Sequence, residues 1–505
     1  MADRAGRAAV GAGAGLLVIA VAALVVIDTD AGTLRAAQVT RTIGWLAVAF
    51  IGYVVVLAVT QRETWRHPWR WLLVLGLGLR LALVVTTPTL SDDVYRYLWE
   101  GHLVTEGVSP NAFTIDDPAA ERYDTPIRAL VNNPTLASPY LPAAHAIFGA
   151  AVAVFPSHPA TMQFLMIGFD VLGCAMIMRL LALARLPTRR VLLYWLNPLV
   201  IVEVAHGAHI DAIIVGLATA GIVCTLGPRR SAGSKQTAAH LAGPVLVALA
   251  TLTRPLAIFL APVLWWKWDW RQRFLWAATG GVPVAWAVAA NGLGLDESGE
   301  SGAGVFGSMR AYTDTFRFNS GLYHWLETWV GSQGLDDRGW NEPMALTRLV
   351  FGVSTVAVLA WVFVTARRAD DSRAALRLMT VPVMAYVLFT PVVHPWYLLL
   401  LLALVPFLAP GLSGPGSSES GQRESAGRWL VAAPWLVLSA TVVLSYLTYR
   451  DPAAFAELVW VRRVVWLPTF ALLAVAGSWD MAGSWDMAGW WGRRSRRAPS
   501  TQEQA

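Results

Sequence analysis

Charged residues are scarce in this sequence. They make up 14% of its 505 residues, whereas a typical soluble domain carries about 25%. Hydrophobic residues make up 56%, so the chain has too little polar surface to solubilise a globule of this size. Since apolar runs recur along almost the whole chain and no long polar block interrupts them, we expect a protein embedded in a membrane.

Several other features are rare or absent. Cysteine occurs only at Cys174 and Cys224, each inside an apolar run, which favours buried small side chains over a disulfide or a metal pair. The patterns G-x-x-x-x-G-K-[ST], G-x-G-x-x-G after a strand, and H-E-x-x-H do not occur, so nucleotide-driven transport and zinc proteolysis have no local support. Lys and Arg exceed Asp and Glu by 39 to 33, an excess typical of cytoplasmic loops rather than of a nucleic-acid partner.

Apolar runs approach the roughly 20 residues that a helix needs to cross a bilayer. The expected fold class is all-α: one polytopic transmembrane helix bundle of about 14 spans over residues 1–475, followed by a cytoplasmic tail at 476–505. We expect a first extracytoplasmic loop at 88–160, a second at 293–342 and a flexible cytoplasmic linker at 411–428, which is rich in Gly and Ser. The expected spans are 9–27, 42–59, 71–87, 162–183, 191–205, 209–226, 242–253, 255–266, 274–292, 343–366, 375–391, 396–410, 430–448 and 457–475.

Clusters of arginine and lysine predict the orientation, because such clusters collect in cytoplasmic loops. They place both termini in the cytoplasm, and we expect the protein in the plasma membrane. For all the clusters to be cytoplasmic, two apolar runs marked by prolines cannot be simple single spans. The run 141–155 is expected to be a helix in the outer interface, and Arg254-Pro255 is expected to divide 242–266 into a hairpin of two short helices. The first loop, the His206–Asp211 turn, the second loop and the turn around His394 then share the extracytoplasmic face.

The first loop opens with paired carboxylates, Asp92 and Asp93. A carboxylate here could take a proton from an attacking hydroxyl, its pKa raised by its neighbour and by partial burial. The alternatives are a divalent cation held by the pair and a plain helix N-cap, for which Asp is a preferred residue. Aromatic and basic residues that suit a sugar-binding or phosphate-binding wall follow within ten positions, namely Tyr95, Arg96, Trp99 and His102.

Other ionisable residues interrupt apolar segments elsewhere. Arg254 needs either an anionic ligand, for which phosphate is the natural candidate, or a salt-bridge partner in the bundle. His394, between two prolines, is a functional candidate or a residue of an aromatic belt. His209 and Asp211 lack the spacing of an established zinc motif, so we favour substrate contact or support over metal binding.

These residues resemble a known family. Asp93 to Gly101 reads D-x-Y-R-Y-x-W-E-G, Gly107 to Asn111 forms a G-x-S-P-N turn, and Ser138 to Pro142 reads S-P-Y-L-P. Together with Gly207–Ala212, Thr253–Pro255 and His394–Tyr397, they resemble the GT-C superfamily of membrane glycosyltransferases. Within it the resemblance is to polyprenol-phosphate-mannose-dependent mannosyltransferases. The motif departs at His102, where arginine is common, and at Arg254, where lysine is frequent.

The resemblance implies an inverting sugar transfer, of mannose, from a polyprenyl-phosphate donor to a lipid or glycan acceptor at the extracytoplasmic face. Asp93, or Asp92, would be the general base, and Arg254 and His394 would face the donor phosphate. Tyr95, Arg96, Trp99, His102, His209, Asp211 and Tyr397 would complete the substrate-binding site. We expect no cofactor and no metal, with a divalent cation at the two aspartates as the alternative.

Two other functions fit a polytopic chain. A secondary transporter predicts inverted repeats and charges near the midplane, but no such repeat is evident and the charges gather at one face. A flippase of lipid-linked glycans would share the arginines and aromatic residues at that face.

Overall fold

The computed structural model describes residues 2–27, 36–62, 65, 67–155, 158–227, 234–294, 303–333, 343–408, 430–450 and 457–481. The predicted linker 411–428 and the tail beyond residue 481 lie outside these ranges. Helices dominate the described residues, and the β-structure found among them is an isolated bridge between Phe318 and Val392. The all-α fold class is therefore confirmed.

The α-helices are α1 (Ala2–Val26), α2 (Ala36–Thr60), α3 (Trp71–Leu83), α4 (Asp93–Thr105), α5 (Pro142–Val154), α6 (Pro159–Leu183), α7 (Leu192–Trp195), α8 (Pro198–Ala205), α9 (Asp211–Leu226), α10 (Ser234–Thr253), α11 (Ala261–Leu264), α12 (Trp270–Asn291), α13 (Gly307–Thr315), α14 (Leu322–Ser332), α15 (Pro343–Ala366), α16 (Ser372–Phe389), α17 (Leu399–Leu404), α19 (Ala433–Thr441) and α20 (Val459–Met481). Short 3₁₀ helices, labelled η, are η1 (Pro118–Tyr123), η2 (Arg128–Leu130), η3 (Thr188–Val191), η4 (Pro255–Leu260), η6 (Pro395–Leu398), η7 (Val405–Phe407) and η8 (Val442–Arg450).

Seven of the described helices are long and apolar enough to cross a membrane. They lie in α1, α2, α6, α12, α15, α16 and α20. Shorter apolar helices lie at Trp71–Leu83, Pro142–Val154, Asp211–Leu226, His240–Thr253, Pro255–Leu264 and Pro395–Phe407. The protein is thus a polytopic helix bundle, while the larger number of crossings expected from the sequence stays a prediction.

Proline explains why several apolar segments are short. A residue before proline is pushed out of the α-helical region, and proline itself suits the first turn of the next helix. Asn197, Arg254 and His394 each precede such a proline and have extended backbones, with ψ of 122°, 138° and 153°. The predicted division at Arg254 is therefore observed. The expected span 191–205 is likewise divided, at Asn197. Each break brings a polar side chain into an otherwise apolar bundle.

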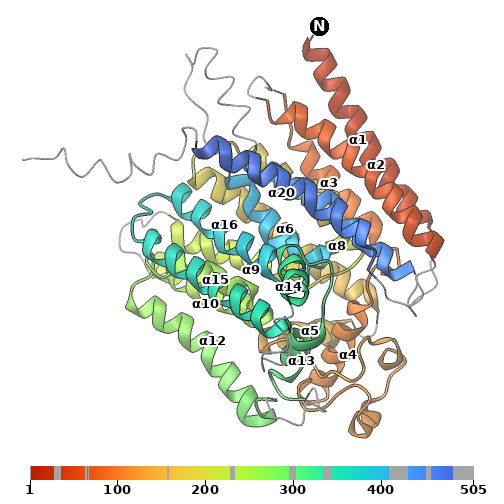
Figure 1. The fold of residues 1–505 in the computed structure, drawn as a ribbon, viewed down its shortest axis with the longest axis vertical. Helices are drawn as coiled ribbons and strands as arrows, with labels where there is room; N and C mark the ends of the chain where they lie inside the picture. Colours follow the sequence, from red (N-terminus) through yellow and green to blue (C-terminus); the bar gives the residue numbers. More distant parts are fainter. Residues whose placement is uncertain are drawn as a thin grey trace, which may run out of the picture.

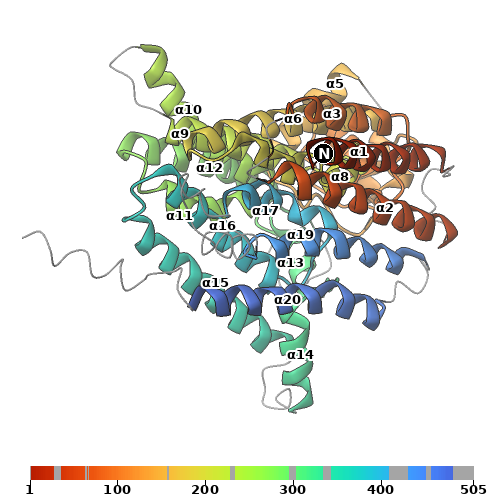
Figure 2. The same ribbon diagram turned by 90° about the horizontal axis from the view of Figure 1, so that it is seen from above.

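The helices pack along the sequence and across it. α1 packs on α2, α9 packs on both α6 and α10, and α4 packs on α5. Figure 1 shows α4, α5 and α13 gathered at one end of the bundle, and Figure 2 shows α14 projecting from its side. The expected interfacial helix at 141–155 is α5, whose Gly149 lies against Val104 of α4 and would clash if it carried a Cβ. The end that holds α4 and α5 also holds the candidate site.

Candidate active site

The two aspartates stand at the start of α4. Asp92 occupies the N-cap position, but its side chain makes no capping hydrogen bond. Instead, the side-chain amide of Asn132 donates to Oδ1 of Asp92 at 2.6 Å and to Oδ1 of Asp93 at 2.7 Å. Burial raises the pKa of Asp92, and the neighbouring carboxylate of Asp93 raises it further. Both effects favour the protonated form of Asp92.

Asp93 connects α4 to the turn between α8 and α9. Its Oδ2 lies 3.9 Å from Nδ1 of His209, and its side chain is 20% exposed. Nε2 of His209 lies 3.2 Å from a carboxylate oxygen of Glu203, on α8. The other oxygen of Glu203 accepts a hydrogen bond of 2.7 Å from the hydroxyl of Tyr446. A partly exposed carboxylate thus stands in front of a buried histidine, glutamate and tyrosine.

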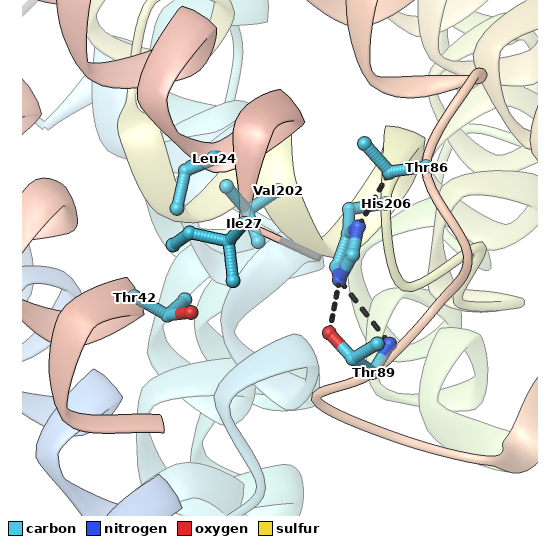
Figure 3. Close-up of a pocket in the computed structure, with 7 residues that line it drawn as sticks. All are labelled: Leu24, Ile27, Thr42, Thr86, Thr89, Val202 and His206. Carbon is cyan, nitrogen blue, oxygen red and sulfur yellow. Dashed lines mark hydrogen bonds between the residues drawn. The ribbon is translucent and has the colours of Figure 1, made fainter. Parts of the chain in front are cut away.

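His206, in the same turn, points elsewhere. Figure 3 shows it hydrogen-bonded to Thr86 and Thr89 at a pocket that Leu24 and Val202 also line. The backbone N–H of Thr89 donates to Nε2 at 3.2 Å, and Nδ1 lies 2.7 Å from the Thr86 hydroxyl. Burial lowers the pKa of His206 to about 4. This neutral histidine fixes the segment before α4 to the α8–α9 turn.

Three aromatic rings continue a stack that begins at His209. The imidazole of His209 stacks on the ring of Trp396, with ring centroids 3.8 Å apart. The ring of His394 also stacks on Trp396, with centroids 4.4 Å apart. Phe318 stacks on His394 at 4.6 Å. Burial and the charge of Arg254 lower the pKa of His394 well below its ordinary value. His394 is therefore neutral, and its buried Nδ1 has no hydrogen-bond partner among the described residues.

Arg254 lies against the same cluster. Its Nη1 lies 3.0 and 3.2 Å from the two carboxylate oxygens of Asp211, which is fully buried. The guanidinium stacks over the ring of Tyr397 at 3.8 Å, and the hydroxyl of Tyr397 lies 2.7 Å from that of Tyr312. The salt-bridge alternative is thus observed. The Arg254 side chain nevertheless remains 19% exposed, so a ligand can still reach it.

Arg96 donates hydrogen bonds to the loop that carries Asn132. It is 3% exposed, and it donates to the Asn132 side chain at 3.2 Å and to the backbone carbonyls of Asn133 at 3.1 Å and Leu136 at 3.3 Å. Of the other residues predicted on α4, Trp99 is fully buried and Tyr95 is 4% exposed. His102 is half-buried and lies 5.9 Å from the Trp99 ring. Substrate contact by these four residues stays a prediction.

The structure brings together Asp92, Asp93, His209, Asp211, Arg254, His394 and Tyr397, which come from four separate stretches of the chain. It adds Asn132, Glu203, Trp396 and Tyr446, which sequence reasoning did not assign to the site. No group of three or more His, Cys, Asp or Glu side chains able to hold a metal ion occurs within the described ranges.

A carboxylate pair, an arginine and stacked aromatic rings lie in one cluster of a polytopic helix bundle, the arrangement expected of a membrane glycosyltransferase of the GT-C type. Comparison with known proteins is more specific. The family described as "Alpha-(1->6)-mannopyranosyltransferase, N-terminal domain" matches residues 5–270, just over half of the chain, and the chain belongs to this family. "MptB C-terminal domain" matches residues 333–412. The two matches together include every residue of the cluster except Tyr446.

A curated relative agrees with the family. The chain is 28% identical over 354 residues to "Alpha-(1->6)-mannopyranosyltransferase A" of Mycobacterium tuberculosis (strain ATCC 25618 / H37Rv), an alignment that covers 62% of this chain and 61% of the relative. No solved structure matches the chain. The resemblance to GT-C mannosyltransferases drawn from the sequence is thereby confirmed at the level of the family.

Proposed function

We propose that the protein transfers mannose from a polyprenyl-phosphate donor to a hydroxyl of a lipid or glycan acceptor, at the extracytoplasmic face of the plasma membrane. The relative's name supports an α-(1→6) linkage as the product. The observation that carries the proposal is the cluster itself: a partly exposed carboxylate, Asp93, faces His209, and a partly exposed guanidinium, Arg254, is bound to Asp211, two residues after His209.

Asp93 acts as the general base. As the acceptor oxygen attacks C1 of the mannose, its O–H bond breaks and the proton passes to Asp93, while the C1–O bond to the phosphate breaks and the electron pair leaves with the phosphate. Asn132 holds one carboxylate oxygen and leaves Oδ2 for the acceptor. Positioned bases of this kind contribute about 10²–10⁴-fold in rate.

Arg254 stabilises the leaving phosphate. Its Nη1 is bound to Asp211, and the part of the side chain that stays exposed can donate to an anion. His394 is neutral, so it contributes a hydrogen bond to the phosphate rather than a counter-charge. Because an inverting displacement reverses the configuration at C1, an α-linked product requires a β-linked donor.

The test uses purified protein in detergent with radiolabelled polyprenyl-phosphate-mannose and extracted lipid acceptors. Wild-type protein is expected to form labelled, base-stable glycolipid, and Asp93→Asn is expected to lower the rate at least about 100-fold. Asp92→Asn is the matched control with a smaller expected loss. Transfer that survives Asp93→Asn contradicts the assignment of the base. In a second preparation, with the protein reconstituted in lipid vesicles, movement of labelled donor across the bilayer without a new glycosidic bond would indicate a flippase or transporter.

The same assay tests the alternative role of the aspartate pair. If Asp92 and Asp93 held a divalent cation, EDTA would abolish transfer and Mg²⁺ or Mn²⁺ would restore it. We expect transfer to persist in EDTA, since Asn132 already occupies one oxygen of each carboxylate.

A further inference from the structure

Behind Asp93, His209 presents one ring nitrogen to each of two carboxylates. Nδ1 faces Asp93 at 3.9 Å and Nε2 faces Glu203 at 3.2 Å. The far oxygen of Glu203 accepts a hydrogen bond from Tyr446 at 2.7 Å. The exposed fractions of His209, Glu203 and Tyr446 are 0%, 1% and 0%. These side chains form a row of contacts that leads from the partly exposed base, Asp93, into the interior of the bundle.

The imidazole cannot turn away from the two carboxylates. Trp396 covers one face of the ring at 3.8 Å with an interplanar angle of 10°. Gly207 leaves room for the ring edge, because a Cβ there would lie 2.7 Å from Cδ2 of His209. The backbone N–H of His209 donates to the carbonyl of Glu203 at 2.9 Å, which holds both residues in the same turn. The ring orientation is therefore fixed by packing and by the backbone.

Isolated carboxylates are costly to bury, and so is a histidine with unsatisfied nitrogens. Neither nitrogen of the buried His209 ring makes a hydrogen bond among the described residues, so both remain available to the carboxylates that face them, and the protonated ring could donate to both. Because Nε2 lies nearer to a carboxylate than Nδ1 does, we assign the proton of a neutral ring to Nε2, which leaves the lone pair of Nδ1 facing Asp93. This is the tautomer that can receive a proton from the base.

We propose that His209 and Glu203 are positioning residues that act through Asp93, as a proton relay. This proposal rests on the proposed function. After Asp93 has taken the proton of the acceptor hydroxyl, the proton passes from Oδ2 to Nδ1 of His209, and the imidazolium is stabilised by the Glu203 carboxylate. The 3.9 Å separation closes by rotation of the Asp93 carboxylate or through one water when the acceptor binds, since catalytic hydrogen bonds are often long without substrate. Asp93 is thereby returned to its ionised form.

The kinetic test compares Glu203→Gln, His209→Gln and Tyr446→Phe with wild type, as kcat and KM for the labelled donor across pH. Glu203→Gln is expected to lower kcat by about 10–100-fold with KM within about twofold. The acid limb of the kcat profile should move to lower pH, because the substitution removes a carboxylate 3.2 Å from the ring that receives the proton. Tyr446→Phe should shift the limb in the same direction by less. The titratable groups that lie around His209 are Asp93 from α4, Glu203 from α8, His206 from the turn, Asp211 from α9 and His394 before η6. Burial lowers the pKa of His206 to about 4, so its removal takes away no charge.

His206→Asn is the matched control, since it removes a buried histidine three residues earlier that bonds Thr86 and Thr89. It should lower the melting temperature and leave the acid limb in place. A Glu203→Gln profile that coincides with that of wild type, or one that moves only as far as the His206→Asn profile, overturns the relay while leaving mannosyl transfer intact.

A measurement independent of transfer separates the two proposals. In protein labelled with ¹⁵N-histidine, the resonances lost in His209→Gln identify His209. Their pH titration should move when Asp93→Asn or Glu203→Gln is introduced. Resonances that titrate identically in all backgrounds refute the relay even if no sugar transfer is observed. Titration that moves as expected in a protein without transfer supports the relay and contradicts the proposed reaction.

Discussion

At the scale of the residue, Arg254 combines a structural contact with an expected functional one. Its Nη1 neutralises Asp211, which is fully buried, while 19% of its side chain stays exposed beside the Asp93 cluster. Removal of one partner of a buried pair leaves an uncompensated charge, which costs about 3–5 kcal/mol. The effect of an Arg254 variant on transfer therefore has to be separated from its effect on folding.

A double variant separates them. Arg254→Gln alone should lower both the melting temperature and the transfer rate. Arg254→Gln with Asp211→Asn should recover most of the melting temperature, because no buried charge is left unpaired, while transfer stays about 10²–10³-fold below wild type for lack of the phosphate-binding cation. The measurements are thermal unfolding in detergent and the labelled-donor assay. Recovery of transfer in the double variant would show that Arg254 is a structural residue only.

Individual site residues were predictable to different degrees. Asp93, Arg254 and His394 stand out in the sequence because an ionisable residue in or beside an apolar segment needs an explanation. Asn132 carries no such signal, since it lies in an irregular loop about 40 positions from the aspartates it bonds, and only tertiary structure brings them together. Trp396 is adjacent to His394 in sequence, but its position between two imidazoles depends on His209, from a distant turn.

At the scale of the element, α4 and the loop at 132–138 act as one unit. Arg96 bonds the loop backbone, and Glu100, one turn later on α4, accepts a hydrogen bond of 2.8 Å from the Ser138 hydroxyl. The pattern of aromatic and basic residues on α4 suggested a ligand-binding wall. Periodicity could not show that the face of α4 that carries Arg96 and Glu100 would be covered by its own loop. Burial raises the pKa of Glu100 to about 7, which makes this unit sensitive to pH.

The stability of the protein should therefore fall as pH rises. A carboxyl with a raised pKa in the folded state binds its proton more tightly there than in the unfolded chain, so its contribution is present below the unfolded pKa and is lost as pH rises through about 7. From about pH 5 to about pH 8, the loss of stability should be on the order of 1–3 kcal/mol.

Melting temperatures across this pH range should decline in wild type and decline less in Glu100→Gln. The control is Glu106→Gln, at the exposed end of the same helix, which should follow wild type. Parallel curves for the wild type and the Glu100→Gln variant would contradict the role assigned to this carboxyl.

Also at the scale of the element, the turn between α8 and α9 determines the position of the His209 ring. Ala208 has a φ of +54°, and Gly207 packs against the His209 ring. Gly207→Ala should displace the ring and lower transfer by roughly 10-fold or more, because a small misplacement of a positioned group is costly in rate. Gly168→Ala on α6 is the control, since a Cβ there meets no atom within 4 Å. Equal transfer rates in the two variants would mean that the turn does not hold His209 in place.

At the scale of the whole molecule, a buried ion pair joins α3 to α6, and a tyrosine of α7 bonds to the same pair. Nε of Arg80 on α3 donates to Asp170 on α6 at 2.5 Å, and neither side chain is exposed. The hydroxyl of Tyr194 on α7 donates to the other oxygen of Asp170 at 2.6 Å, and the Arg80 guanidinium stacks on Trp195 at 3.7 Å. Each residue is ionisable and lies within an expected span, so the sequence carries a signal for both. Which partner each one finds depends on helix packing.

The pair should determine how well the bundle holds together without taking part in transfer. Arg80→Met should destabilise the protein by about 3–5 kcal/mol, because Asp170 then stays buried without its counter-charge. Arg80→Met with Asp170→Leu removes both charges and should recover most of that loss, since well-packed apolar side chains often replace a buried ion pair without net cost. Thermal unfolding in detergent measures both variants, and the transfer rate per folded molecule should match wild type in each. A double variant as unstable as Arg80→Met would show that the contacts of Arg80 with Gly76 and Trp195, rather than its charge pairing, hold these helices together.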